Sequence, residues 1–337
     1  MNLLHKNYVL LFVGLLGLTA SIGCEDRVDL PQTVGEPEYD PAAVLEEMVD
    51  MRTHRLPWSD DQSLTITELK TTGREPKGIV LFQHGFAQQV EGYLVSLHHI
   101  AAHGWWVIAP QYDASLDAAK SHTQLRDDTL RLLQMMRDSS WPGAGASELP
   151  VALAGHSRGG KQSIMAALQD SHVRALALWD PVDSQPPFGD FDPAEYPSIA
   201  PERMSDYRTP TLIIGAQLGG EGGVSEQPCA PVEDNWERYA ENATSAVWID
   251  TWLVGDGGHA DFIDACADDP SVITCTLCSY GAASAATRQA SMVLTVAFLD
   301  AVVAGDEQAR QWLLQTAPQA LEGAVRQSGY SRTNPWP

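Results

Sequence analysis

The sequence predicts a single α/β domain of three layers, in which a mostly parallel sheet carries helices on both faces. Two observations lead to this prediction. Short apolar runs alternate along the chain with amphipathic runs of helical spacing, as parallel strands do with their crossover helices. The 337 residues are 44% hydrophobic and contain no repeat at a fixed period, which indicates one large core rather than a repeat array.

Each apolar run is predicted as a strand and each amphipathic run as a helix. The strands are expected at Leu64–Leu69, Gly78–Phe82, Trp106–Ala109, Val151–Ala154, Ala175–Trp179, Thr211–Ile214 and Val247–Val254. The helices are expected at Tyr93–His103, Leu125–Arg137, Lys161–Gln169 and Ala286–Val303. Loops after the carboxyl ends of such strands carry the functional groups. Residues 181–210 are irregular and rich in proline, so we expect a lid-like insertion or a pocket wall there.

Residues 1–23 have the pattern of an export signal. Lys6 precedes an apolar stretch from Val9 to Leu18, which is too short to span a bilayer comfortably. The small residues before Cys24 resemble the lipobox of bacterial lipoproteins, so we expect Cys24 to become a lipidated N-terminus. Ordinary cleavage nearby, with a free Cys24, is the alternative.

The rest of the chain is predicted to be a tether followed by one folded domain. Residues 24–40 are polar and lack periodicity, which indicates a flexible tether, and residues 41–337 form the domain. The formal net charge is −23, so nucleic acid and anionic lipid headgroups are poor partners. We therefore expect an exported protein, held by its lipid anchor at a bacterial membrane, periplasmic or on the cell surface, or otherwise secreted.

Four cysteines remain once Cys24 is set aside: Cys229, Cys266, Cys275 and Cys278. In an exported protein they allow two disulfides with three possible connectivities. The C-T-L-C spacing of Cys275 and Cys278 also suits a metal or redox pair. A zinc site would need a second close pair of ligands, which the sequence lacks, so structural disulfides are favoured and no metal is expected.

The segment G-H-S-R-G at 155–159 lies between a predicted strand and a predicted helix. In that context G-x-S-x-G predicts a nucleophile elbow, where a strained serine occupies a sharp turn and the glycines let strand and helix approach. We therefore predict an α/β-hydrolase fold with Ser157 as its nucleophile. A serine at an ordinary strand-to-helix turn is the alternative.

A serine nucleophile needs a histidine base and an acid that orients the base. His259 lies in G-D-G-G-H-A-D-F after the last predicted strand, where glycines let the loop carry the imidazole over the sheet. Asp180 ends the strand A-L-A-L-W-D, and Asp183 is the runner-up acid. The chain order serine, acid, histidine matches this fold. His156 is expected to point away from the nucleophile.

Ester hydrolysis also requires backbone N–H groups that stabilise an oxyanion. One donor should be the amide of Arg158, directly after the serine. The other should follow the strand Gly78–Phe82, where H-G-F-A is found. We assign this oxyanion-hole donor to the amide of Phe86, with Ala87 as the alternative.

The chain resembles the chlorophyllases, a branch of the α/β-hydrolases, from about Lys77 to Asp306. The most specific piece is G-H-S-R-G-G-K, which extends the generic serine motif. H-G-F, W-D-P-V-D, I-I-G-A-Q-L-G, C-A-P and G-H-A-D-F also occur in the family's order. The resemblance implies an esterase for bulky hydrophobic esters, with Ser157, Asp180 and His259 as nucleophile, acid and base.

Together these residues predict a carboxylic-ester hydrolase of chlorophyllase-like type that forms an acyl-enzyme and needs no metal or organic cofactor. Within the hydrolases, the alternative is a surface esterase resembling a lipase, cutinase or polyester hydrolase, which often takes its acid from the following strand. An alternative from another class is a lipoprotein that binds a ligand on a hydrolase scaffold without turnover.

Overall fold

The structure is a computed structural model, and it describes residues 39–59, 62–112, 120–142, 145–185, 191–222, 228–269 and 273–327. The predicted signal peptide, Cys24 and most of the predicted tether lie outside these residues. Tyr39 already belongs to the folded domain, since its ring packs against Trp312 and its hydroxyl donates to Asp300. None of the described helices combines the length and apolar character needed to cross a membrane.

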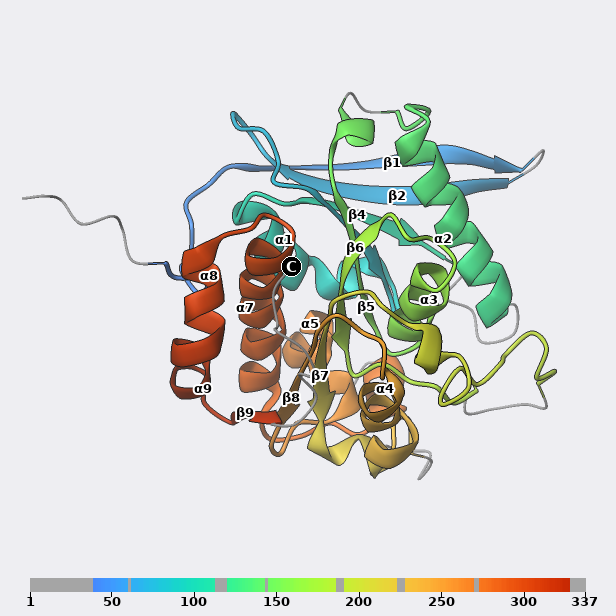
Figure 1. The fold of residues 1–337 in the computed structure, drawn as a ribbon, viewed down its shortest axis with the longest axis vertical. Coiled ribbons are helices and arrows are strands. Elements are labelled where there is room, and N and C mark those ends of the chain that lie inside the picture. Colours follow the sequence, from blue (N-terminus) through green and yellow to red (C-terminus); the bar gives the residue numbers. More distant parts are fainter. Residues whose placement is uncertain are drawn as a thin grey trace, which may run out of the picture. The chain divides into compact units, whose positions relative to one another are not determined.

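In the described part of the chain, one sheet has nine strands in the order β1-β2-β4-β3-β5-β6-β7-β8-β9 (Figure 1). Neighbours from β4 to β8 are parallel, whereas the pairs β1–β2, β2–β4 and β8–β9 are antiparallel. The strands are Val49–Ser59 (β1), Gln62–Thr71 (β2), Ile79–Gln83 (β3), Trp106–Gln111 (β4), Val151–His156 (β5), Val173–Trp179 (β6), Thr211–Ala216 (β7), Ile249–Val254 (β8) and Ala324–Gln327 (β9). The carboxyl ends of the parallel strands therefore share one edge of the sheet.

Helices cover both faces of this sheet, as predicted. Side chains alternate along a strand, so Val80 and Phe82 of β3 belong to one apolar cluster with residues of α1, α7 and α8. Ile79 and Leu81 belong to a second cluster with residues of α2, α3 and α4. Figure 1 shows the resulting three layers. The helices are Leu94–Ala102 (α1), His122–Arg137 (α2), Arg158–Ala167 (α3), Trp236–Asn242 (α4), Asp264–Asp268 (α5), Ile273–Thr276 (α6), Ser284–Val302 (α7), Glu307–Gln311 (α8) and Ala317–Ala320 (α9).

Every predicted strand and helix is present, and the structure adds elements that the apolar pattern does not reveal. The edge strand β1 is mostly exposed and contains charged residues such as Arg52, and β9 is only four residues long. The helix α3 begins at Arg158 rather than at the predicted Lys161. The apolar pattern does not reveal this first turn, because Gly159 and Gly160 carry no side chain.

The described residues of the proline-rich stretch 181–210 pack onto the domain. Those that enter the apolar cluster beside α2, α3 and α4 are Ile199, Ala200, Met204 and Tyr207. Residues 182, 184 and 185 border a pocket at the carboxyl edge of the sheet. The start of this stretch therefore lines the pocket and its later part packs onto the domain, whereas a lid-like motion stays a prediction.

Candidate active site

Ser157 occupies a sharp turn between β5 and α3. Its backbone has φ 57° and ψ −123°, a region that residues with a side chain rarely adopt. Its N–H donates to the Trp179 carbonyl of β6 at 2.9 Å, which fixes the turn against the sheet. The structure thus contains the strained strand-to-helix turn that the G-x-S-x-G spacing predicts.

The two glycines of this motif are required by close backbone contacts. A Cβ on Gly159 would lie 2.0 Å from the Gln83 carbonyl oxygen of β3, and a Cβ on Gly155 would lie 2.6 Å from backbone atoms of Gly159. Because backbone atoms cannot move aside as a flexible side chain can, only glycine fits at either position. This contact lets α3 begin directly over the strand ends.

Ser157, His259 and Asp180 form one continuous chain of hydrogen-bond contacts. His259 Nε2 is 2.9 Å from Ser157 Oγ, and His259 Nδ1 is 2.6 Å from Asp180 Oδ2. Because a carboxylate can only accept, we assign the proton of neutral His259 to Nδ1, which leaves Nε2 to accept from the serine hydroxyl. His259 and Asp180 are buried, 4% and 0% exposed, so water competes little for these bonds.

Backbone and side-chain contacts hold the acid and the histidine loop in place. Asp180, which directly follows β6, accepts the Ala216 N–H through its second oxygen at 3.0 Å. Asp261 accepts the N–H groups of Gly258 and Gly281 at 2.8 and 3.0 Å, which ties the histidine loop to the segment before α7. Burial raises the pKa of Asp261 to about 6, and these two N–H groups oppose that rise.

His156 and Tyr93 form a second network beneath the histidine, which the sequence analysis did not identify. The centroid of the His156 ring lies 4.8 Å from that of the His259 ring. His156 Nε2 lies 3.0 Å from the His259 carbonyl oxygen and its Nδ1 lies 2.8 Å from the Tyr93 hydroxyl, so Nε2–H donates and Nδ1 accepts from the phenol. Burial and the neighbouring His259 hold the pKa of His156 well below its usual value, consistent with this neutral role. The two aromatic residues therefore support the backbone of His259.

The predicted oxyanion loop follows β3 and faces the serine. Phe86 and Arg158 both border the pocket beside Ser157, whereas the alternative donor Ala87 does not. His84 fixes this loop through Nδ1, which donates to the Gly85 carbonyl at 2.8 Å. Burial, helped by the positive charge of Arg158, lowers the pKa of His84 to about 3, so its ring is neutral at pH 7.

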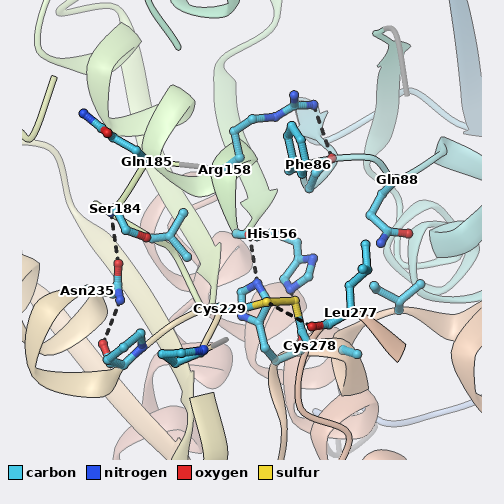
Figure 2. A pocket seen from close by; sticks show the side chains of 18 of the residues that line it. Phe86, Gln88, His156, Arg158, Ser184, Gln185, Cys229, Asn235, Leu277 and Cys278 are labelled. Carbon is cyan, nitrogen blue, oxygen red and sulfur yellow. Dashed lines mark hydrogen bonds between the residues drawn. A yellow bond between two sulfur atoms is a disulfide. The ribbon is translucent and has the colours of Figure 1, made fainter. Parts of the chain in front are cut away.

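A pocket of about 190 Å³ opens beside Ser157 and His259 (Figure 2). The disulfide Cys229–Cys278 forms part of its wall and joins the chain after β7 to the chain before α7. A second disulfide, Cys266–Cys275, lies within the segment between β8 and α7. The four predicted cysteines are therefore paired. The apolar lining consists of Phe86, Val182, Pro228, Pro231, Ala260, Ile263 and Leu277. Among the described residues, no group of three or more His, Cys, Asp or Glu side chains could hold a metal ion.

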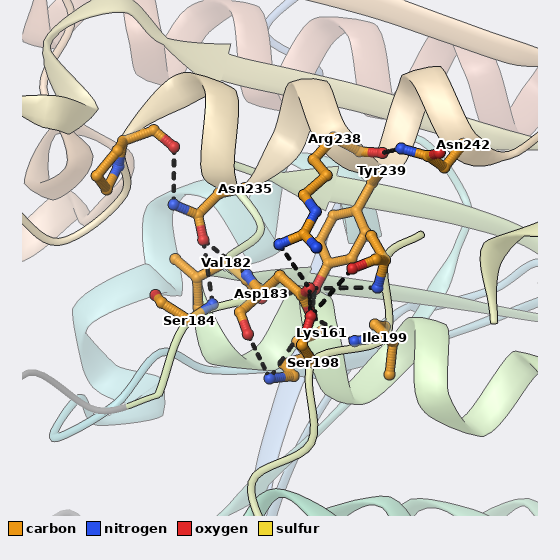
Figure 3. Close-up of polar contacts among 12 residues, drawn as sticks. Lys161, Val182, Asp183, Ser184, Ser198, Ile199, Asn235, Arg238, Tyr239 and Asn242 are labelled. Atoms are coloured by element: carbon orange, nitrogen blue, oxygen red, sulfur yellow. Dashed lines mark hydrogen bonds and ion pairs between the residues drawn. The ribbon is translucent and has the colours of Figure 1, made fainter. Parts of the chain in front are cut away.

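Asp183, the runner-up acid, belongs to a different network (Figure 3). Its carboxylate accepts from the Ser198 hydroxyl, the Tyr239 hydroxyl and the backbone N–H groups of Ile199 and Ala200. These donors come from the proline-rich stretch and from α4. In the described part of the chain it makes no contact with His259, so its bonds connect the pocket wall to α4.

Lys161 of α3 supplies the charge that balances Asp183. Its ammonium is completely buried, donates to the Asp183 carbonyl at 2.6 Å and lies 3.6 Å from the carboxylate. Burial lowers the pKa of Lys161 to about 8, and the Asp183 carboxylate opposes this shift. The lysine of G-H-S-R-G-G-K therefore anchors the pocket wall rather than the nucleophile.

The sheet order, the helices on both faces and the serine turn after β5 define the α/β-hydrolase fold. A solved structure described as a ferulic acid esterase from Streptomyces cinnamoneus has the same fold. It aligns with a TM-score of 0.60 and 18% sequence identity, over 85% of this chain and 98% of that one.

The chlorophyllase family model matches residues 38–326, and the chain belongs to the chlorophyllase family. It is 29% identical to "Chlorophyllase-1, chloroplastic" of Citrus sinensis over 59% of this chain and 58% of that protein. It is 28% identical to "Chlorophyllase-2" of Arabidopsis thaliana over 68% of this chain and 74% of that protein. The alignment thus spans less than two thirds of the length of the Citrus sinensis relative.

A methyl group at Gly159, next to the serine turn, should strongly destabilise the fold. Gly159→Ala forces a Cβ against the Gln83 carbonyl, so we expect the free energy of unfolding to fall by about 3 kcal/mol or more. Gly255→Ala is the matched control, because its Cβ would have no neighbour closer than 3.6 Å. Urea denaturation measures both variants, and equal stability of the two would contradict the close-contact argument.

Removing one partner of the buried Lys161–Asp183 pair should cost more than removing both. Asp183→Asn leaves a buried ammonium without its counter-charge, and we expect a loss of about 3 kcal/mol in the free energy of unfolding. The double variant Lys161→Met/Asp183→Asn should recover at least about 1 kcal/mol of that loss. Asp206→Asn, at an exposed site, should change stability by less than about 0.5 kcal/mol. Additive losses in the double variant would refute the pairing.

Buried histidines should make the domain sensitive to acid. Burial, followed by the charges of Lys161 and Arg158, lowers the pKa of His122 from 6.5 to about 2. Between these values the unfolded chain binds a proton that the folded chain does not, so the free energy of unfolding decreases as pH falls below about 6.5.

The variant His122→Phe isolates this contribution, because it removes one titrating group. We expect its stability to fall less steeply from pH 6 to pH 4 than that of the parent. The difference in slope should approach about 1.4 kcal/mol per pH unit. Denaturation at several pH values provides the measurement, and parallel slopes would contradict the assignment.

Proposed function

We propose that the protein is a carboxylic-ester hydrolase that uses Ser157 as nucleophile, His259 as general base and Asp180 as the acid that orients the base. The observation that carries this proposal is the buried contact chain from Ser157 through His259 to Asp180, with distances of 2.9 and 2.6 Å. Membership of the chlorophyllase family supports the same chemistry.

In the first step, His259 Nε2 takes the Ser157 proton while the serine oxygen attacks the ester carbonyl carbon. The carbonyl oxygen becomes an oxyanion, which accepts hydrogen bonds from the backbone N–H groups of Phe86 and Arg158. His259 then gives its proton to the leaving alkoxide as the C–O bond breaks. The products of this step are a free alcohol and an acyl group bonded to Ser157.

In the second step, water replaces the alcohol. His259 takes a proton from water, the resulting hydroxide attacks the acyl carbon, and the proton returns to Ser157 as the acid leaves. Asp180 stabilises the imidazolium that forms twice in this cycle, and the second oxygen of Asp180 keeps its bond to the Ala216 N–H throughout. The chain's own residues therefore account for each proton transfer.

The pocket favours an ester with a large apolar part. Its lining is mainly apolar, including Phe86, Ile263 and the Cys229–Cys278 disulfide. Its volume of about 190 Å³ is below the roughly 300–1,000 Å³ of sites that enclose a drug-sized ligand. A bulky ester would therefore insert one arm and leave the remainder across the mouth of the pocket. Chlorophyll, which the names of the relatives suggest, belongs to this class.

The contact between Asp180 and His259 favours the strand before β7 as the source of the acid, whereas the alternative surface esterases often take it from β7 itself. The first acid after β7 is Glu221, which is exposed. The alternative of a non-catalytic lipoprotein predicts no ester hydrolysis, so that the parent chain and Ser157→Ala would behave alike.

Hydrolysis should depend on Ser157 and on Asp180. We expect Ser157→Ala and Asp180→Asn to reduce kcat by about 10³-fold or more on p-nitrophenyl butyrate and on chlorophyll a, followed by phytol release. Asp256→Asn is the matched control, because this exposed carboxylate lies on the histidine loop and should retain the activity of the parent.

Two results would contradict the proposal. Equal activity of Ser157→Ala and the parent would exclude a serine nucleophile, and full activity of Asp180→Asn would assign the acid to another residue. Hydrolysis of p-nitrophenyl butyrate without chlorophyll hydrolysis would retain the triad and exclude chlorophyll as a substrate.

A further inference from the structure

The Arg158 side chain is a buried cation beside the nucleophile. It is 2% exposed and borders the pocket. Figure 2 shows it extending alongside Phe86, whose ring lies 5.6 Å from the guanidinium carbon. Burial lowers the pKa of Arg158 to about 10, so the group still carries its charge at neutral pH.

This charge has no counter-ion among the described residues. The guanidinium donates one hydrogen bond, from Nη2 to the Gly85 carbonyl at 3.2 Å, and its Nε is buried without a partner. The polar groups that oppose the pKa shift are the phenols of Tyr112, Tyr93 and Tyr196, all neutral at pH 7. Lys161, three residues further along α3, is in contrast paired with Asp183.

A second buried polar group borders the same pocket. His122, the first residue of α2, is 2% exposed, and its Nδ1 has no partner. Its ring is neutral, because burial and the charges of Lys161 and Arg158 lower its pKa to about 2. Arg158 and His122 thus each carry a buried nitrogen without a partner, and both side chains border one mainly apolar pocket. This is unusual, since buried polar groups are nearly always paired.

We propose that Arg158 binds a second oxygen acceptor of the substrate, a carboxylate or a carbonyl of the acyl group, so that the pocket selects esters that carry this acceptor. The inference rests on the proposed ester hydrolysis and adds a substrate class to it. An acceptor oxygen would satisfy the guanidinium in a site from which water is largely excluded, where a charge-assisted hydrogen bond is strong. His122 would border the bound acceptor as a neutral group.

A purely structural role for Arg158 makes a different prediction. Its bond to Gly85 also connects α3 to the oxyanion loop, so loss of the guanidinium could slow the hydrolysis of every ester equally. The binding role instead changes the ratio of kcat/KM between esters with and without an acceptor. This ratio separates the two roles even where the absolute rate falls.

The test compares three methyl esters of similar length by pH-stat. They are methyl hexanoate, which has no second acceptor, methyl 5-oxohexanoate, which has a neutral ketone, and monomethyl adipate, which has a carboxylate. In the parent chain we expect kcat/KM for at least one acceptor ester to exceed that of methyl hexanoate by about 10- to 100-fold. Which acceptor ester is favoured identifies a charged or a neutral acceptor.

In Arg158→Met this ratio should fall to about one, and in Arg158→Lys, which retains a charge without the planar fork, it should be intermediate. Arg203→Met, at an exposed site, is the control and should keep the ratio of the parent. A parent ratio near one, or a ratio that Arg158→Met leaves unchanged, overturns the inference and leaves the proposed hydrolysis intact.

Binding to the Ser157→Ala chain separates this inference from the proposed function. Isothermal titration calorimetry with the same three esters requires no turnover. We expect the favoured acceptor ester to bind at least tenfold more tightly than methyl hexanoate, and the preference to disappear when Arg158→Met is added. If no ester is hydrolysed but this preference is observed, the proposed function fails and the acceptor site stands. If the preference is absent, the inference fails.

Discussion

The contact of backbone against backbone between α3 and β3 is the constraint on which the candidate site depends. Gly159 lies so close to the Gln83 carbonyl that no Cβ fits between them. This approach accompanies the strained backbone of Ser157, which has a positive φ of 57° at the turn between β5 and α3. Because β6 and β8 end at the same edge of the sheet, Asp180 and His259 reach the serine from their own loops. The functional geometry therefore follows from the packing of one helix on a parallel sheet.

The two buried cations of α3, Lys161 and Arg158, differ in whether the described residues supply a counter-ion. Lys161 is paired with Asp183, whose carboxylate also accepts a hydrogen bond from Tyr239 of α4, so the lysine charge is balanced within the protein. Arg158, one position after the nucleophile, faces neutral groups and the pocket instead. In a chain with a net charge of −23, a buried cation without a counter-ion is conspicuous. An acceptor on a bound ligand would offset the free-energy cost of burying this unpaired charge.

Much of this arrangement could be predicted from the sequence, for identifiable reasons. Buried strands of a parallel sheet are continuous apolar runs, so their positions can be predicted from the sequence. The glycine spacing around Ser157 can be predicted as well, because it reflects a steric requirement. The edge strands β1 and β9 cannot be predicted in this way, because exposed strands need no apolar alternation. The bonds of His156 and Tyr93 were missed for another reason, since residues 63 positions apart have no local pattern that joins them. The disulfide connectivity likewise depends on where loops meet in space.

The most direct measurement of the central claim is to map the site of covalent modification after treatment of the full chain with a fluorophosphonate. This reagent reacts with a serine that a neighbouring histidine activates. The geometry predicts one adduct per chain, located by peptide mass spectrometry on Ser157 and suppressed by His259→Gln. An unmodified Ser157, or an adduct that forms equally in His259→Gln, would contradict the assignment of a catalytic serine.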